Sequence, residues 1–273
     1  MQYPPTRRDG FTLVELLVVI GVIALLISIL LPTLAGARKS ARRVACASNL
    51  RQNTIALLQY ADRHDGKLPL GYTNGWKQFN YAASRNGAFG GGTVPEPERP
   101  RWLGQLWLDD LMPAGEVWYC PEESDPLIRY DAEGVNPWPP ATADGSTRTR
   151  LGYGTRPILD WPEPPTGDAN PLTGMPDAAM PKIVQFSAEV VVLADLLHKP
   201  SQLDERHVDG LNASRLDGSA AWVRREVLED VEVDGKAWPD VPEDGFDREW
   251  NAVFLEERPD GPVGVWPAMD RAR

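Results

Sequence analysis

The sequence LLVVIGVIALLISILLPTLAGA runs from Leu16 to Ala37 and contains 22 residues without a charge. As an α-helix it would be roughly 33 Å long, which is enough to cross the hydrocarbon core of a membrane. A buried core helix or the apolar part of a secretory signal peptide is the alternative, but a signal peptide usually has a shorter apolar stretch. Because this run is longer and leads into a further helical pattern, it predicts a retained membrane helix.

Charge is distributed unevenly along the chain of 273 residues, which is 42% apolar and has a net charge of −11. Residues 1–51 carry seven basic and two acidic side chains, a net charge of +5. Residues 52–273 carry 21 basic and 37 acidic side chains, a net charge of −16. The overall composition is that of an ordinary globular protein. The acidic larger part argues against nucleic acid as a partner, since binding phosphates needs a basic face.

The helical pattern continues beyond the apolar run. Small and apolar residues recur at three- and four-residue spacings between Ala41 and Ala61. Asp65-Gly66 and Pro69 then form a typical helix stop. The spacing therefore predicts one long helix over residues 11–64, whose second half packs on a globular body.

One carboxylate, Glu15, stands at the edge of the apolar run, where it is unfavourable unless it has a partner. The surrounding sequence GFTLVELLVVI, residues 10–20, resembles the type IV prepilin signature shared by pilins and type II secretion pseudopilins. The resemblance implies that a prepilin peptidase cuts between Gly10 and Phe11, and that the new amine of Phe11 is N-methylated. It also implies that Glu15 pairs with the terminal amine of a neighbouring subunit, and that Pro32 marks a kink in the helix.

The resemblance also implies a topology, with the N-terminus in the cytoplasm and the body outside it. The four basic residues between Arg38 and Arg43 would by the positive-inside rule give the opposite orientation. We follow the resemblance because its motif is the more specific signal, and expect a single-pass protein of the bacterial inner membrane with its body in the periplasm or in a surface filament. The expected organisation is a leader over residues 1–10, a transmembrane helix over 11–37, the exterior half of the helix over 38–66 and a globular pilin-like body over 67–273.

The sequence contains two cysteines, Cys46 on the exterior half of the helix and Cys120 in the body. If the body lies outside the cytoplasm, oxidation is permitted. A Cys46–Cys120 disulfide would then contribute about 4–5 kcal/mol in the chain-entropy model. Two buried thiols are the alternative, and two isolated cysteines give little indication of a metal site.

The body has loop-rich and strand-rich parts. Residues 70–180 hold most of the glycine and proline and predict loops with a short helix over 101–112 and an extended segment over 117–120. In the C-terminal half, Asp217-Gly218 predicts a β-hairpin. The fold class we expect is α+β, a long N-terminal transmembrane helix packed on an antiparallel β-sheet with long loops, as in pilins. The predicted strands are 184–187, 190–194, 211–216 and 219–224.

A second resemblance concerns the body. His207, the nine residues after it and Asp217-Gly218 resemble an element near the C-terminus of a large family of bacterial pilin-like proteins. Cys46-Ala-Ser-Asn49-Leu50 and Cys120-Pro121 resemble two further features of that family. Ser219 departs from its pattern, because a second histidine often follows the Asp-Gly pair.

Four residues of the C-terminal half, Asp195, His198, His207 and Asp209, could bind a metal, with calcium preferred because aspartates abound. The other interpretation, which we adopt, is ordinary hydrogen bonding by exposed loop side chains, so we expect no metal or other cofactor. The sequence has neither a Gly-x-Ser-x-Gly nor a His-Glu-x-x-His motif. We therefore expect that the protein is not an enzyme.

The expected function is that of a pilin-like or pseudopilin subunit, processed by prepilin peptidase and assembled into a type II secretion or type IV pilus-type filament. Its expected partners are the peptidase, other copies of itself or other pilin-like subunits, and the inner-membrane assembly machinery. The alternative is a membrane-tethered extracytoplasmic binding module that does not polymerise. In that case the body, which holds all ten tryptophans, would recognise a glycan or a secreted protein.

Overall fold

The computed structural model describes residues 12–69 and a series of stretches in the body. The chain divides into two compact units, residues 1–42 and 43–273. The described stretches of the body are 73–74, 77–78, 103–112, 114–130, 135–136, 138, 149–156, 182–195, 203, 207–229, 231–233, 236–237, 256–258, 261–263 and 265–272.

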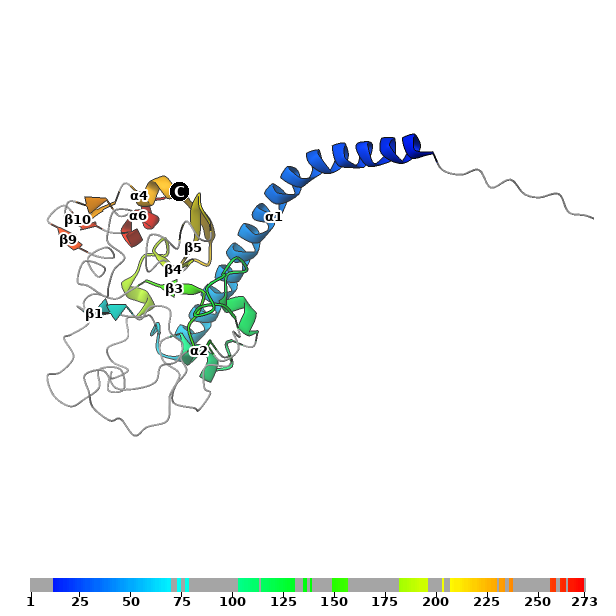
Figure 1. The fold of residues 1–273 in the computed structure, drawn as a ribbon. Coiled ribbons are helices and arrows are strands. Elements are labelled where there is room, and N and C mark those ends of the chain that lie inside the picture. Colours follow the sequence, from blue (N-terminus) through cyan, green and yellow to red (C-terminus); the bar gives the residue numbers. More distant parts are fainter. Residues whose placement is uncertain are drawn as a thin grey trace, which may run out of the picture. The chain divides into compact units, whose positions relative to one another are not determined.

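The predicted long helix is confirmed as α1, a continuous helix of 51 residues from Leu13 to Arg63 (Figure 1). It ends at the predicted place, where Asp65 and Gly66 take φ angles of 56° and 78°. The Gly66 N–H donates a hydrogen bond of 2.7 Å to the carbonyl of Ala61. Left-handed residues that close the last turn in this way terminate helices.

In the first unit, α1 presents its apolar side chains on every side. The large hydrophobic residues from Leu13 to Leu34 are between 46% and 74% exposed. The apolar part of α1 is not buried, and among the described residues this is the one helix that is long and apolar enough to cross a membrane. A surface of this kind needs hydrocarbon or other helices around it.

In the second unit, α1 is amphipathic and one of its faces is buried. Its side chains there enter the main hydrophobic core together with Leu106, Trp118, Tyr153 and Leu193. The buried residues recur at three- and four-residue spacings, as the sequence pattern predicts. They are Cys46, Leu50, Asn53, Thr54, Ala56, Leu57, Tyr60 and Ala61.

The core of the body contains a four-stranded antiparallel sheet in the order β3-β4-β5-β6. The α+β class is thus confirmed. Three strands correspond to predicted ones, whereas β3 was not predicted. The strands are β3 (Tyr153–Thr155), β4 (Val191–Asp195), β5 (Gly210–Arg215) and β6 (Ala220–Arg224).

The hairpin between β5 and β6 is confirmed, but its turn is longer than predicted. The Arg215 N–H donates to the Ser219 carbonyl (2.8 Å), and the Gly218 N–H donates to the Arg215 carbonyl (2.9 Å). Gly218 has a φ of 83°, whereas Asp217 does not take positive φ. The connection is therefore a three-residue loop with glycine in the left-handed position, rather than a two-residue turn.

The two faces of the sheet are covered by different helices. On one face, the Ser214 hydroxyl lies 2.7 Å from the Thr54 hydroxyl of α1. On the other, Leu211 and Ala213 pack in a second core with α4 (Arg225–Glu229) and α6 (Val265–Arg271). Since successive residues of a strand point to opposite faces, β5 contributes to both cores.

The remaining elements are short. One prediction is wrong here: residues 184–187 are not a strand but overlap a single turn of 3-10 helix, held by the hydrogen bond from Phe186 N–H to Ile183 O (3.1 Å). The expected extended segment over 117–120 begins only at Tyr119, because the residues before it belong to another 3-10 turn, held by the hydrogen bond from Tyr119 N–H to Glu116 O (3.1 Å). The predicted helix over 101–112 shrinks to five residues. These elements are α2 (Gly104–Leu108), η1 (Gly115–Trp118), η3 (Ile183–Gln185) and the antiparallel pairs β1 (Thr73–Asn74) with β2 (Lys77–Gln78), β7 (Glu232–Val233) with β8 (Lys236–Ala237), and β9 (Glu256–Arg258) with β10 (Gly261–Val263).

Candidate functional site

The start of α1 carries the residues expected to act in processing and assembly. Gly10 and Phe11 lie outside the described residues. Glu15 lies in the first turn, where its carboxylate accepts hydrogen bonds from the Thr12 N–H (2.9 Å) and hydroxyl (2.7 Å), while the Glu15 N–H donates to the Thr12 hydroxyl (3.2 Å). This reciprocal arrangement is a capping box, which satisfies free N–H groups at a helix start. Pro32 lies inside α1, with helical residues on both sides.

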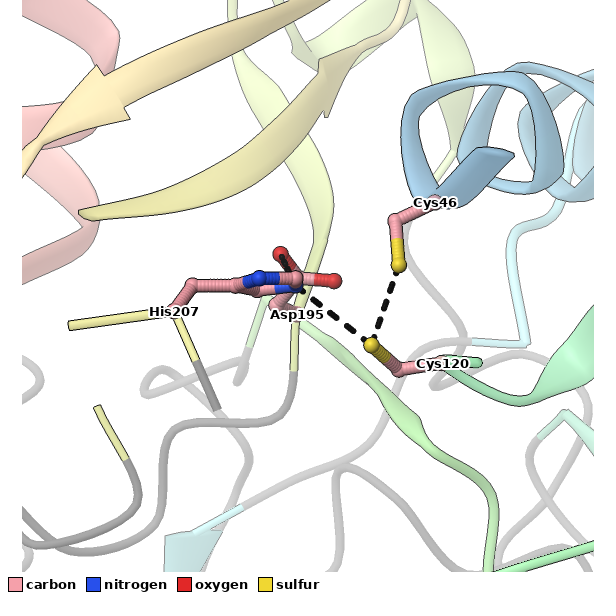
Figure 2. Close-up of side chains that lie close together, drawn as sticks. All are labelled: Cys46, Cys120, Asp195 and His207. Carbon is pink, nitrogen blue, oxygen red and sulfur yellow. Dashed lines mark hydrogen bonds and ion pairs between the residues drawn. The ribbon is translucent and has the colours of Figure 1, made fainter. Parts of the chain in front are cut away.

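A buried polar cluster lies in the body, where four distant segments meet (Figure 2). The Cys46 and Cys120 sulfur atoms are 3.0 Å apart, as free thiols. This separation exceeds the about 2.05 Å of a disulfide bond. His207 Nε2 lies 3.4 Å from the Cys120 sulfur and 3.5 Å from Asp195 Oδ2.

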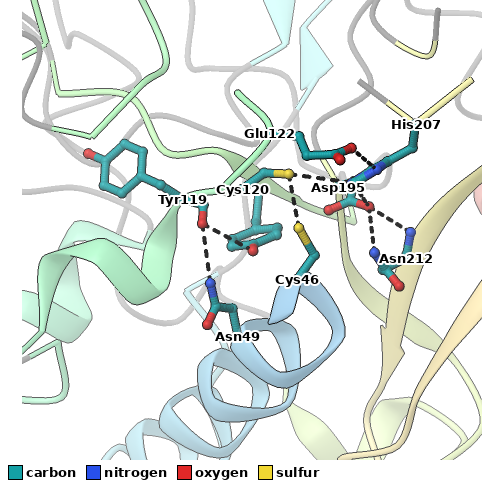
Figure 3. Close-up of polar contacts among 9 residues, drawn as sticks. Cys46, Asn49, Tyr119, Cys120, Glu122, Asp195, His207 and Asn212 are labelled. Atoms are coloured by element: carbon teal, nitrogen blue, oxygen red, sulfur yellow. Dashed lines mark hydrogen bonds and ion pairs between the residues drawn. The ribbon is translucent and has the colours of Figure 1, made fainter. Parts of the chain in front are cut away.

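The imidazole of His207 is fixed from its other side (Figure 3). Its Nδ1 lies 2.6 Å from Glu122 Oε2. The ring of Trp222 packs edge to face against the imidazole, with the two ring centroids 5.6 Å apart. Burial opposes protonation of the ring, but the Cys120 contact and the charges of Asp195 and Glu122 outweigh it and raise the pKa of His207 to about 9. Nδ1 of the protonated ring therefore forms an ion pair with Glu122, and Nε2 faces the sulfur of Cys120.

Cys120 is held by contacts to the backbone just before it. The carbonyl of Tyr119 accepts hydrogen bonds from the Asn49 side chain (3.3 Å) and the Tyr153 hydroxyl (3.2 Å). A Cβ on Gly152 would lie 2.7 Å from the Cys120 nitrogen, so only glycine fits there. The hydrogen bond to Cys46 and burial raise the pKa of the Cys120 thiol.

Asp195, the last residue of β4, is oriented by the neighbouring strand. Its Oδ2 accepts hydrogen bonds from the Asn212 backbone N–H (2.6 Å) and side chain (3.1 Å). The Asp195 side chain is 3% exposed and that of His207 is 2% exposed. Both groups are thus inside the protein and not on the loop surface.

The geometry explains the spacing of the C-terminal element. His207 stands before β5, and Asp217-Gly218 belongs to the loop after it, so the nine intervening residues comprise this six-residue strand and three flanking residues. Hydrogen bonds from the Ser219 side chain and from the Ser219 N–H (2.8 Å) to the Asp217 carboxylate lower the pKa of Asp217. The Asp217 N–H donates to the Ala188 carbonyl (2.9 Å). One end of the element thus reaches the buried cluster, and the other is tied to the loop before β4.

The cysteine motif after the apolar run has a comparable explanation. Cys46 contributes its sulfur to the cluster, Asn49 binds the Tyr119 carbonyl, and Leu50 is fully buried in the core. One turn of α1 therefore carries all three roles, because residues three and four apart share a helix face.

The metal cluster suggested by the sequence is brought together only in part. Asp195 and His207 meet, but Asp209 does not join them, because its side chain is 59% exposed and lies 3.8 Å from the Arg43 guanidinium. His198 lies outside the described residues. The two cysteines, expected to pair with each other or to remain buried thiols, complete the cluster instead. Their place in short motifs shared with the His207 element was the signal that could have linked them.

The five tryptophans within the described residues are buried or half-buried. Trp118 and Trp266 are each 2% exposed. Trp138 packs edge to face against Tyr119, with their ring centroids 6.2 Å apart. The Arg43 guanidinium lies 3.5 Å from the ring centroid of Trp222. In this part of the chain the tryptophans therefore serve packing, and no exposed aromatic platform forms from them.

Comparison with known proteins gives two family matches. Residues 5–31 match the model described as a prokaryotic N-terminal methylation motif, and residues 35–114 match the one described as a protein of unknown function (DUF1559). Neither match reaches the His207–Gly218 element. No curated protein and no solved structure matches the chain. The matches indicate that the N-terminal segment carries a prepilin-type methylation motif, as in type IV pilin-like and pseudopilin proteins, and together they cover less than half of the chain.

Proposed function

We propose that the chain is a pilin-like or pseudopilin subunit that prepilin peptidase cleaves between Gly10 and Phe11. The mature subunit, N-methylated at Phe11, then assembles with other copies or other pilin-like subunits into a type II secretion or type IV pilus-type filament. The observation that carries the proposal is the exposed apolar half of α1, with a single carboxylate in its first turn, inside the segment that matches the methylation motif.

The apolar half of α1 suits two surroundings in succession. In the inner membrane it is solvated by lipid, and in a filament its side chains pack against those of neighbouring helices. Both surroundings exclude water, so the same side chains serve insertion and assembly. In this proposal the inner-membrane assembly machinery moves the subunit from one to the other, and the body stays outside the cytoplasm.

Glu15 has a different partner in each state. Within one subunit the capping box with Thr12 satisfies its carboxylate. In the filament the amine of a neighbouring Phe11 would pair with it, and a buried carboxylate becomes tolerable when a buried ammonium meets it. The capping contacts hold the carboxylate at the helix start until that partner arrives.

Three variants separate the charge of Glu15 from its capping role. Glu15→Gln removes the charge but preserves the capping box, which accepts glutamine as well as glutamate. Thr12→Val removes the cap and retains the charge, and Glu15→Ala removes both. All three should be inserted and cleaved. We expect the chain to vanish from sedimented filaments in both Glu15 variants and to remain there in Thr12→Val, when each is expressed with the assembly machinery.

Assembly of Glu15→Gln at the wild-type level would overturn the proposed pairing. If Thr12→Val were the only variant that failed to assemble, the role of Glu15 would be to cap the start of α1 instead. A wild-type chain that is cleaved and methylated but never self-associates would favour the membrane-tethered binding module.

A further inference from the structure

We propose that Cys46, Cys120, Asp195 and His207 form a structural zinc site inside the body. Each residue offers one ligand atom, all four are buried, and all these atoms lie within 4.8 Å of one another. Two cysteines, a histidine and a carboxylate are a ligand set that zinc accepts, and structural zinc sites have four protein ligands.

The distances are close to those of a tetrahedral site. Zinc bonds of 2.0–2.3 Å place neighbouring ligand atoms roughly 3.3–3.8 Å apart. The Cys120 sulfur lies 3.4 Å from His207 Nε2, which in turn lies 3.5 Å from Asp195 Oδ2. The Cys46 and Cys120 sulfur atoms, 3.0 Å apart, would separate slightly to admit the ion.

Two of the ligands have the outer partners that metal sites require. Glu122 forms an ion pair with His207, its Oε2 lying 2.6 Å from Nδ1, and this leaves Nε2 facing the cluster. Asn212 donates two hydrogen bonds to Asp195. Carboxylate–histidine pairs of this kind orient metal-bound imidazoles. A disulfide would use only the two sulfur atoms and would leave the convergence of His207 and Asp195 on them without a purpose.

The donor set selects the metal. Thiolates are soft ligands that favour zinc, whereas calcium takes six to eight oxygen ligands. Two sulfur atoms and one nitrogen atom among four ligands therefore exclude calcium from this cluster. Because the site is closed by four buried protein side chains, the ion would act in stability and not in catalysis.

Binding would displace protons and not electrons. The Cys46 and Cys120 thiols each release one proton as their zinc–sulfur bonds form, and His207 releases its Nε2 proton. Asp195 binds as the carboxylate, and the released protons go to solvent. No oxidant or reductant takes part.

The site would connect four segments of the body. It joins the buried half of α1, the second residue after η1, the end of β4 and the approach to β5 (Figure 2). Cys46 and Cys120 are 74 positions apart, and Cys120 and His207 are 87 apart. One ion at this point would thus hold α1 on the sheet independently of the membrane segment.

The test uses the full chain in detergent, kept reduced and free of chelators. Elemental analysis should find about one zinc per chain. Cobalt titration of the metal-free protein should produce thiolate-to-cobalt charge-transfer absorption, which is lost in Cys46→Ser and Cys120→Ser. His207→Gln should weaken zinc binding by more than about 100-fold and Glu122→Gln by about 10–100-fold. Asp209→Asn, an acidic residue two positions from His207 but outside the cluster, is the matched control and should bind zinc as wild type does.

Two results would overturn the site. One is that the wild-type chain, folded and kept reduced, takes up neither zinc nor cobalt, while a sample of the same protein that was never reduced contains a Cys46–Cys120 disulfide. The other is equal loss of zinc in Asp209→Asn and in the ligand variants. The cobalt spectrum of the wild-type chain decides the matter even if a cysteine variant fails to fold.

Discussion

The two halves of α1 belong to one continuous helix but have opposite surroundings. In the first unit the side chains from Leu13 to Leu34 are exposed all round the helix, as for Leu26 at 54%. In the second unit one face is buried, and Leu50 and Leu57 are fully inaccessible. Both halves are helical throughout.

The difference shows that helix formation and helix burial have separate causes here. The first half is uniformly apolar and depends on lipid or neighbouring helices, whereas the second is patterned at three- and four-residue spacings and depends on the sheet. A substitution in one half should therefore leave the properties of the other unchanged.

The largest effect is expected for Gly10→Glu, which should abolish processing. A charged side chain next to the proposed cut would prevent the peptidase from accepting the bond. Mass spectrometry of the membrane-extracted chain should find the leader still attached, while the body unfolds as in wild type. Gly21→Ala is the control, because a Cβ there meets nothing within 4 Å, and it should be cleaved normally. Normal cleavage of Gly10→Glu would refute the cleavage site.

A pair of leucine variants should produce the next largest effect. Leu57→Ala leaves a cavity in the core and should lower the free energy of unfolding of the body by about 2–5 kcal/mol. Leu26→Ala, in the exposed half, should leave it unchanged. Denaturant unfolding in micelles, followed by tryptophan fluorescence, measures both, since every tryptophan lies in the body. Equal destabilisation by the two variants would contradict the separation of the halves.

The smallest effect concerns the end of α1. Lys182 Nζ lies 2.5 Å from Asp65 Oδ2 and holds the pKa of Asp65 below its ordinary value. The folded chain therefore binds this proton less readily than the unfolded chain. The resulting stability is present above the unfolded pKa and is lost as pH falls through the folded pKa.

Asp65→Asn should accordingly narrow the difference in melting temperature between neutral and acidic solution. Asparagine tolerates the left-handed backbone at this position, so the helix stop is preserved. Lys182→Met should narrow the difference equally, because it removes the partner. If either variant lost as much melting temperature in acid as wild type does, the Asp65–Lys182 pair would contribute nothing to the pH dependence of stability.

Much of the fold could be predicted because the deciding signals are local. The apolar run, the spacing after Ala41 and the stop at Asp65-Gly66 each lie within one turn or one span of helix. The hairpin at Asp217-Gly218 was found for the same reason. Its turn type was missed because a third residue, Leu216, joins the loop, and no pattern in the sequence fixes that length.

The predictions that failed depend on burial or on contacts with distant residues. Val184 lies in an apparently strand-like segment, yet its side chain is 83% exposed and it forms part of a 3-10 turn beside the end of α1. A β-branched residue favours a strand mainly through packing in a sheet, and Val184 forms a turn without being buried. Strand β3 was missed because Gly152 and Gly154 hide its pattern, although the close approach of Gly152 to Cys120 requires glycine. The role of α6 as the cover of the second sheet face depends on contacts with β4, such as the hydrogen bond of 2.7 Å from the Val191 N–H to Asp270.

The sequence by itself determined the membrane helix, its processing motif, its length and its end, because these depend on neighbours within a few residues along one helix. Only the tertiary structure decided that Cys46, Cys120, Asp195 and His207 share one buried point, and that Asp209 does not. The reason is that ligand geometry arises where four segments cross, and their crossing is set by the packing of α1 on the sheet. Spacing along the chain carries no information on such a meeting until the fold has brought the segments together.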